Sequence, residues 1–152
     1  AKSAVATGKT ELFRYISHQI LHNARCLEDK LNIYFSILNS LSYASKVAGS
    51  LDRCKDILSQ LGENIPNDIS HEVMTNRINQ TWLSIEDIPE TELANYKLMT
   101  DKTQLMRMKF LGHLHIMGLI IRPTASPFAI IRMIQLTISQ GKFVKINLFI
   151  IN

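Results

Sequence analysis

The sequence has few cysteines, which excludes a small protein held together by disulfides. Cys26 and Cys54 are its only two and lie far apart without paired spacing, so we expect a reducing compartment, the nucleus or the cytoplasm. Long apolar runs are also missing. None reaches the roughly 18 residues that a membrane-spanning helix needs. The chain begins at Ala1 without Met and has no signal-peptide pattern, so we expect a processed chain or a piece of a larger protein.

The composition is that of a globular protein. The chain has 152 residues, 46% hydrophobic and 20% charged, which is enough to bury a core and too apolar for disorder. One domain over residues 1–152, or a fragment of a larger one, is expected. The formal charge of +4 permits an anionic partner such as RNA, but it is also that of a slightly basic soluble domain.

Apolar residues recur at helical spacing along most of the chain, which predicts a series of amphipathic helices. Ser50 and Ser70 are expected to cap two of them. Loops are predicted at 62–69 and 86–90, where Gly, Pro, Asn and Asp gather. The predicted helices are 10–24, 28–43, 51–61, 70–85, a short one through 93–98, 100–118, and one through 128–138.

Residues 105–138 form the most informative stretch. Its two apolar runs are separated by Arg122-Pro123, so we expect two helices folded against each other across a short turn, with Thr124 or Ser126 capping the second. Glycine inside a helix costs about 1 kcal/mol relative to alanine. We therefore expect a neighbouring helix to approach closely at Gly112, and Gly118 to end the first helix.

These patterns predict an all-α fold of stacked antiparallel helix hairpins, as in a HEAT-like helical repeat, although no exact repeat is visible. Residues 143–151 alternate partly between apolar and polar positions. They could form a short strand or a further helix, and periodicity does not decide between the two.

Nucleotide and metal binding have little support. Thr7-Gly8-Lys9-Thr10 resembles the end of a phosphate-binding loop, but Ser3 stands where that loop requires glycine. His22 and Cys26 are four residues apart on one helix, while Cys54 and His71 have no companion at ligand spacing. We expect no metal, no cofactor and no small-molecule substrate.

Catalytic residues are also not expected. No nucleophile sits in a recognisable elbow, and no carboxylates pair in an apolar setting. His113 and His115 are two residues apart, so they should point to different faces, with at least one exposed. Trp82 and Tyr96 could anchor a partner, but a tryptophan at helical spacing with Ile78 is more often a core residue. The sequence therefore predicts a protein that is not an enzyme.

A group of basic residues is the main candidate for a functional surface. These residues surround stretch 105–138 and could form a face for nucleic acid or a protein partner. The alternative is an ordinary solvated face, which the small net charge favours. On either interpretation, reversing the charge of Arg107 and Lys109 should leave stability intact. The candidate residues are Lys102, Arg107, Lys109, Arg122 and Arg132.

Two segments resemble one family. Residues 27–34 read LEDKLNIY and are followed by Leu38 and Leu41, and residues 109–114 read KFLGHL. Both are similar to helices of the helical-repeat family named after the middle domain of the translation-initiation scaffold protein, which includes the large subunit of the nuclear cap-binding complex. The resemblance implies a non-enzymatic scaffold in mRNA metabolism that binds protein partners, with RNA as a further candidate. In that complex the small subunit holds the cap, so no cap-binding residue is carried over.

Two alternatives stay open. Residues 117–123, MGLIIRP, resemble the helix end that precedes the β-wing in winged-helix domains of replication-origin complex subunits. This interpretation makes residues 128–138 two strands and the helix with Arg107 and Lys109 a DNA-facing element. The upstream helices exceed what one winged helix needs. A helical subunit held in a large assembly is the other alternative, and it would account for the apolar tail 149–151.

Overall fold

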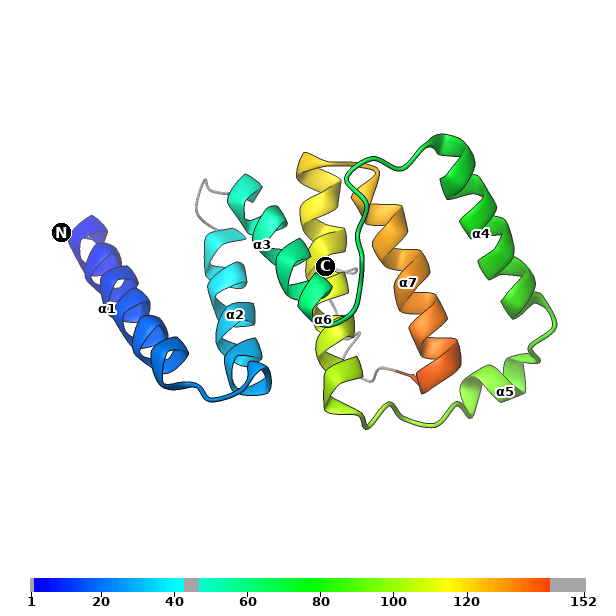
Figure 1. Cartoon of the computed structure of the whole chain (residues 1–152), viewed down its shortest axis with the longest axis horizontal. Helices are drawn as coiled ribbons and strands as arrows, with labels where there is room; N and C mark the ends of the chain where they lie inside the picture. The colour runs from blue at the N-terminus through cyan, green and yellow to red at the C-terminus, as the bar shows by residue number, and fades with distance from the viewer. Residues whose placement is uncertain (1, 43–46, 143–152) are drawn as a thin grey trace. The chain divides into compact units, whose positions relative to one another are not determined.

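The chain is helical and forms two compact units, residues 1–45 and 46–152. The computed structural model describes the backbone of residues 2–42 and 47–142, and the side chains of 11–38, 49–92 and 95–142. Within these residues the only β pairing is one parallel bridge between Leu98 and Lys142, so the predicted all-α fold is confirmed. The helices are α1 Lys2–Asn23, α2 Leu27–Ser42, α3 Val47–Gln60, α4 His71–Glu86, α5 Glu90–Ala94, α6 Lys102–Ile121 and α7 Ala125–Gln140 (Figure 1).

The first unit is the pair of helices α1 and α2, which pack against each other. Glu28 and Asp29 lie in the first turn of α2, where negative charge is favourable next to the unpaired backbone N–H groups. Leu31 and Leu38, seven residues apart on the same face, are buried. The predicted helix boundaries hold for α2 to within one residue, whereas α1 begins eight residues before its predicted start, 2 rather than 10.

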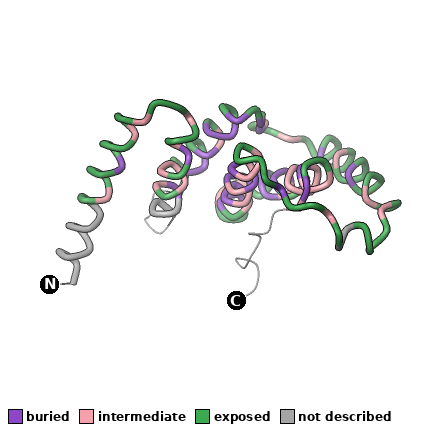
Figure 2. Tube along the Cα trace, turned by 90° about the horizontal axis from the view of Figure 1, so that it is seen from below, coloured by how far each residue is buried: buried purple, intermediate pink, exposed green. Residues whose placement is uncertain are grey.

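The second unit is organised around the α6–α7 hairpin predicted from residues 105–138. Helix α3 packs on α6, and α4 packs on α7, so the order across the unit is α3, α6, α7, α4 (Figure 1). Helix α6 is apolar on nearly all sides, and its two neighbours, α3 and α7, cover this apolar surface. Phe110, Leu111 and Leu114 are fully buried as a result. Purple, buried segments in Figure 2 run along these central helices, while α4 and α5 at the right-hand end are largely green.

The apolar periodicity of helix α3 correctly predicted which of its faces is buried. All of the apolar residues predicted for its core face are buried. Ser50, however, is not the N-cap, because α3 begins three residues earlier at Val47. Its side chain is buried inside the helix instead, with Oγ 3.3 Å from Nε2 of His113. The buried residues of this face are Leu51, Cys54, Ile57, Leu58 and Leu61.

The predicted loops and one predicted cap are present. Helix α3 ends at Gln60 and α4 begins at His71, so the 62–69 loop is confirmed. The Ser70 side chain accepts a hydrogen bond from the backbone N–H of Val73 at 3.2 Å, as a capping serine should. The loop predicted at 86–90 is shorter, residues 87–89, because the short helix predicted through 93–98 lies earlier, as α5 Glu90–Ala94. At α7, Thr124 occupies the N-cap position without a capping side-chain hydrogen bond.

Neither glycine of α6 has its predicted role. A Cβ built on Gly112 would meet nothing within 4 Å, whereas one on Gly118 would lie 2.8 Å from the backbone N of Ser126 and 3.2 Å from its Cα. The close helix approach therefore occurs at Gly118, and the expectation for Gly112 was wrong. Gly118 also does not end the helix, since α6 continues to Ile121.

The winged-helix interpretation fails at its wing. Residues 128–138, which it requires as two strands, lie within α7 and are helical. The α7 side chains of Phe128, Ala129 and Ile131 are buried in the hairpin, so packing as well as local pattern holds this segment in a helix. The predicted strand or helix over 143–151 lies outside the described residues.

Alanine substitution should separate the two glycines. Gly118→Ala is expected to lower the free energy of unfolding by about 1–3 kcal/mol, because the new methyl group would meet backbone atoms that cannot rotate away. Gly112→Ala should raise it by up to about 1 kcal/mol through helix propensity alone. Thermal denaturation followed by circular dichroism measures both. Equal midpoints for the two variants would contradict the close approach at Gly118.

Candidate partner and nucleic-acid surface

Two of the predicted basic residues converge on one buried carboxylate. Glu63, in the loop after α3, has a side chain that is only 4% exposed. Arg132 of α7 donates to it twice, from Nε to Oε2 and from Nη2 to Oε1, each at 2.9 Å. Arg107 of α6 lies further away, with Nη1 3.9 Å from Oε1. Planar, two-point pairing of this kind is the strongest form of the arginine–carboxylate interaction.

The network extends from Arg132 to α4. Arg132 also donates to Oε1 of Gln135, whose Nε2 donates to Oγ1 of Thr81 at 3.0 Å. Thr81 is one of only two buried residues described for α4, with Met74 as the other. Because so little apolar surface of α4 is buried, this polar chain is a substantial part of what attaches α4 to α7.

The loop backbone is shaped to admit Arg107. Gly62 has φ of +84°, and a Cβ there would lie 2.9 Å from Nη2 of Arg107. Positive φ and this proximity both favour glycine over any residue with a side chain. Arg107 also donates from Nη1 to Oε1 of Gln104 at 3.3 Å, while its buried Nε has no hydrogen-bond partner among the described residues.

The other predicted basic residues lie elsewhere. Arg122, after α6, donates to the carbonyl oxygen of Asn67 at 3.5 Å, and Lys55 of α3 donates to Oδ1 of the same residue at 3.2 Å. Burial, and then the positive charge of Arg122, lower the pKa of Lys55. Lys102 is exposed at the start of α6, and Lys109 is half-buried.

The basic residues therefore do not act as one group. Arg107 and Arg132 direct their charge at Glu63 in the interior of the unit, which leaves Lys102, Lys109 and Arg122 as candidates for an outer surface. The structure also changes one expectation from the sequence. Because Arg107 contacts a buried carboxylate and a glycine loop, reversing its charge should lower stability instead of leaving it intact.

Two serine–histidine pairs lie along α6, and both are packing contacts. His113 is buried against Ser50, and burial lowers its pKa below the usual value. Nδ1 of His115 lies 2.8 Å from Oγ of Ser126, which is buried at the start of α7. Neither histidine is exposed, contrary to the expectation that at least one would be. Because both serines are buried, a substrate would not reach either hydroxyl.

The thiols and the metal candidates remain apart. Cys54 donates from Sγ to the carbonyl oxygen of Phe110 at 3.3 Å, and burial raises its pKa to about 12, so the thiol stays protonated. Cys26 is exposed. Among the described residues no group of three or more His, Cys, Asp or Glu side chains could hold a metal ion.

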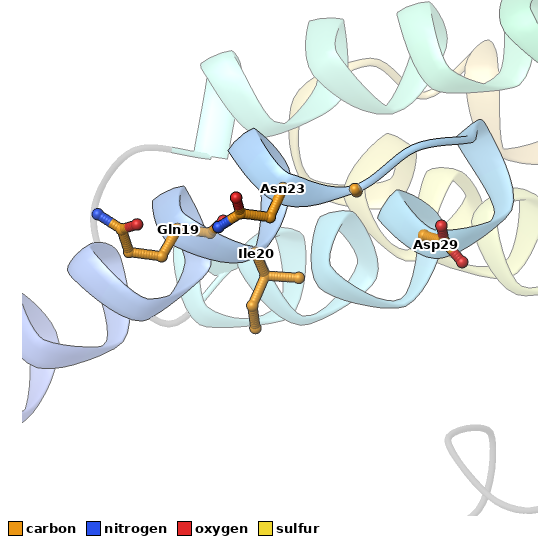
Figure 3. Close-up of a pocket in the computed structure, with 5 residues that line it drawn as sticks. Gln19, Ile20, Asn23 and Asp29 are labelled. Carbon is orange, nitrogen blue, oxygen red and sulfur yellow. The ribbon is translucent and has the colours of Figure 1, made fainter.

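A shallow depression lies in the first unit, at the end of α1 (Figure 3). It is lined by Gln19, Ile20, Asn23, Ala24 and Asp29. The Asn23 amide is already used by the helix, because Nδ2 donates to the carbonyl oxygen of Gln19 at 2.8 Å. The depression is open to solvent and holds one carboxylate and no cation, which gives a ligand few fixed contacts.

The surface that sequence reasoning missed is the outer face of α4. Ile78 and Trp82 are 47% and 64% exposed, so the interpretation of Trp82 as a core residue was wrong. Residues 74 and 81 form the buried row against α7, and 78 and 82 form the neighbouring row. Met74, Ile78 and Trp82 recur at intervals of four residues, so the periodicity alone could not tell which of them face the core.

Searches of protein-family models, of curated proteins and of solved structures give no match to this chain. Among the helices described here, none has the length and apolarity required to cross a bilayer.

Replacing Glu63 should destabilise the second unit. Glu63→Gln removes the charge that two arginines share, and we expect unfolding to become easier by about 2–4 kcal/mol, the cost of leaving part-buried cations unpaired. Asp56→Asn, on an exposed carboxylate inside α3, is the control and should change stability by less than about 0.5 kcal/mol. Urea denaturation measures both. Similar values for the two variants would show that the Glu63 contacts contribute nothing.

The buried histidine should make stability depend on pH. Burial lowers the pKa of His113, so His113 binds a proton more readily in the unfolded chain than in the folded one. The free energy of unfolding therefore decreases as pH falls below about 6.5. His113→Gln should flatten the dependence of the free energy of unfolding on pH between about 7 and 5. His71→Gln, at an exposed position, should leave it unchanged. If the free energy of unfolding of His113→Gln depended on pH as steeply as that of the unchanged protein, His113 would not be the source of the pH dependence.

Proposed function

We propose that this chain is a non-enzymatic helical scaffold that binds protein partners in mRNA metabolism, in the nucleus or cytoplasm. The observation that carries the proposal is the outer face of α4, where Trp82 and Ile78 are exposed beside each other. Exposed tryptophan on a regular helix is costly to keep in water and is enriched at the energetic centres of interfaces. Binding of another protein is the role that this surface supports best.

The mRNA part of the proposal is supported by the resemblance of two segments to the initiation-scaffold family. Residues 27–34 lie at the start of α2, and residues 109–114 lie within α6. The second segment continues through a short turn into α7, which is the helix–turn–helix arrangement that the resemblance implies. The fold is therefore compatible with the family.

RNA is a further candidate ligand, and its surface would be Lys102, Lys109 and Arg122. The two lysines are seven residues apart and so lie on the same side of α6. Duplex DNA is not proposed, because the helical α7 removes the wing on which that interpretation depended.

Co-purification tests the scaffold proposal. The tagged chain, expressed in its own cells, should retain mRNA-associated proteins after RNase treatment, since the contacts are between proteins. Trp82→Ser should reduce their recovery at least five-fold. Tyr15→Ser removes an equally exposed aromatic residue, 64% in each case, and should not. Recovery of the same proteins with the tag alone, or of proteins unconnected with mRNA, would overturn the proposal.

Fluorescence anisotropy with single-stranded RNA tests the basic surface. Lys102→Gln/Lys109→Gln should weaken binding and reduce the slope of log K against log salt by about 1.4, the value for two lost phosphate contacts. Arg25→Gln/Lys30→Gln removes the same charge from the first unit and should have less effect. Equal losses in the two double variants would mean that only net charge matters.

A further inference from the structure

The outer face of α4 has an ordered arrangement of side chains. Ile78, Trp82 and Glu86 follow one another at intervals of four residues, so they form one row along the helix surface. Leu83, next to this row, is 65% exposed. The row is thus apolar over its first part and acidic at its end.

Acidic residues follow the end of this row along the chain. Between Arg77 and Lys97 the sequence contains no basic residue. The guanidinium of Arg77 is not available to the row either, because its Cζ lies 5.2 Å from the centre of the Phe128 ring in the hairpin. Glu86, which ends the row, is exposed, and three further exposed carboxylates follow it in the sequence: Asp87, Glu90 and Glu92.

The helix itself adds to this negative charge. Glu86 is the last residue of α4, and Asp87 is its C-cap. The C-terminal end of a helix carries partial negative charge from its unpaired carbonyl groups, so carboxylates here are in an unfavourable position. No ion pair involving either residue occurs among the described residues. A cation supplied from outside would relieve this repulsion.

We propose that the α4–α5 face, defined as Ile78, Trp82, Leu83 and the exposed carboxylates of residues 86–92, binds a basic helical segment of another protein. Apolar side chains of that segment cover Trp82 and Ile78, and its lysine or arginine side chains pair with Glu86 and its neighbours. This is recognition of an amphipathic helix, with the roles set by charge complementarity. The inference rests on the proposed function, because it specifies the partner of the same surface. A nucleic acid would be repelled here, so RNA and this partner would use different surfaces.

The single tryptophan makes the inference directly testable. The chain has one Trp, so its fluorescence reports only on residue 82. The probe is a synthetic 18-residue helical peptide of leucine and lysine, with leucine on one face. Its addition should shift the emission to shorter wavelength in a saturable manner, and the affinity should fall as salt is raised. The comparison peptides have the same composition in scrambled order, or glutamate in place of lysine.

Variants of the chain locate the binding. Glu86→Gln/Asp87→Asn should weaken binding of the basic peptide at least ten-fold, and Ile78→Ser at least five-fold. Asp52→Asn/Asp56→Asn removes the same charge from exposed positions of α3 and should change the affinity less than two-fold. Circular dichroism verifies that each variant is folded. If the two double variants, each of which removes two negative charges, weakened peptide binding equally, the inference would be overturned.

Other occupants of the face give different results, and each would overturn the inference. A blue shift that appears on concentrating the chain without peptide identifies a second copy as the occupant. A saturable shift with oligouridylate identifies RNA. Failure of the peptide to bind, with mRNA-associated proteins still lost on Trp82→Ser, refutes a basic partner while leaving the scaffold function standing. If the peptide failed to bind and Trp82→Ser also left the recovery of mRNA-associated proteins unchanged, the proposed function would be overturned as well.

Discussion

The contact between α6 and the start of α7 at Gly118 is the constraint on which the second unit depends. An added Cβ would meet Ser126 N at 2.8 Å, so the two helix backbones meet with no side chain between them. This contact fixes where α7 begins relative to α6 and places the Ser126 hydroxyl beside His115. Once the hairpin is fixed, the opposite side of α6 is apolar and must be covered, which α3 does with the five core residues of its buried face.

Charge is arranged around the same hairpin in two different ways. Inside, Glu63 satisfies Arg132 and contacts Arg107, and so ties the loop after α3 to both helices of the hairpin. Outside, Lys102, Lys109 and Arg122 lie on or directly after α6, whereas residues 78–96, at the end of α4 and along α5, hold four exposed carboxylates and no basic residue. The small net charge of the sequence therefore does not describe residues 78–96, where the local charge is negative, and the two proposed surfaces differ in sign for this reason.

The sequence predicted the helices and most of their ends, because apolar periodicity and capping residues act locally. The core face of α3 was predictable for the same reason. The close approach at Gly118 instead of Gly112 was not predictable, because α6 is apolar on nearly all sides and its pattern does not tell which side meets α7. Nor was the pairing of Glu63 with Arg132, which lie 69 residues apart. The basic residues were therefore assigned to a surface before their interior partner could be known.

The two cysteines give each unit its own chemical reporter. Cys26, in the first unit, is exposed and is open to a thiol reagent while the protein is folded. Cys54, in the second, is fully buried between α3 and α6 with a pKa raised to about 12, so it can react only when those helices separate. Labelling kinetics on one sample would therefore distinguish a rapid reaction at the first unit from a slow one that measures the opening of the second. A probe attached at Cys26 would alter no residue of the hairpin or of the α4–α5 face.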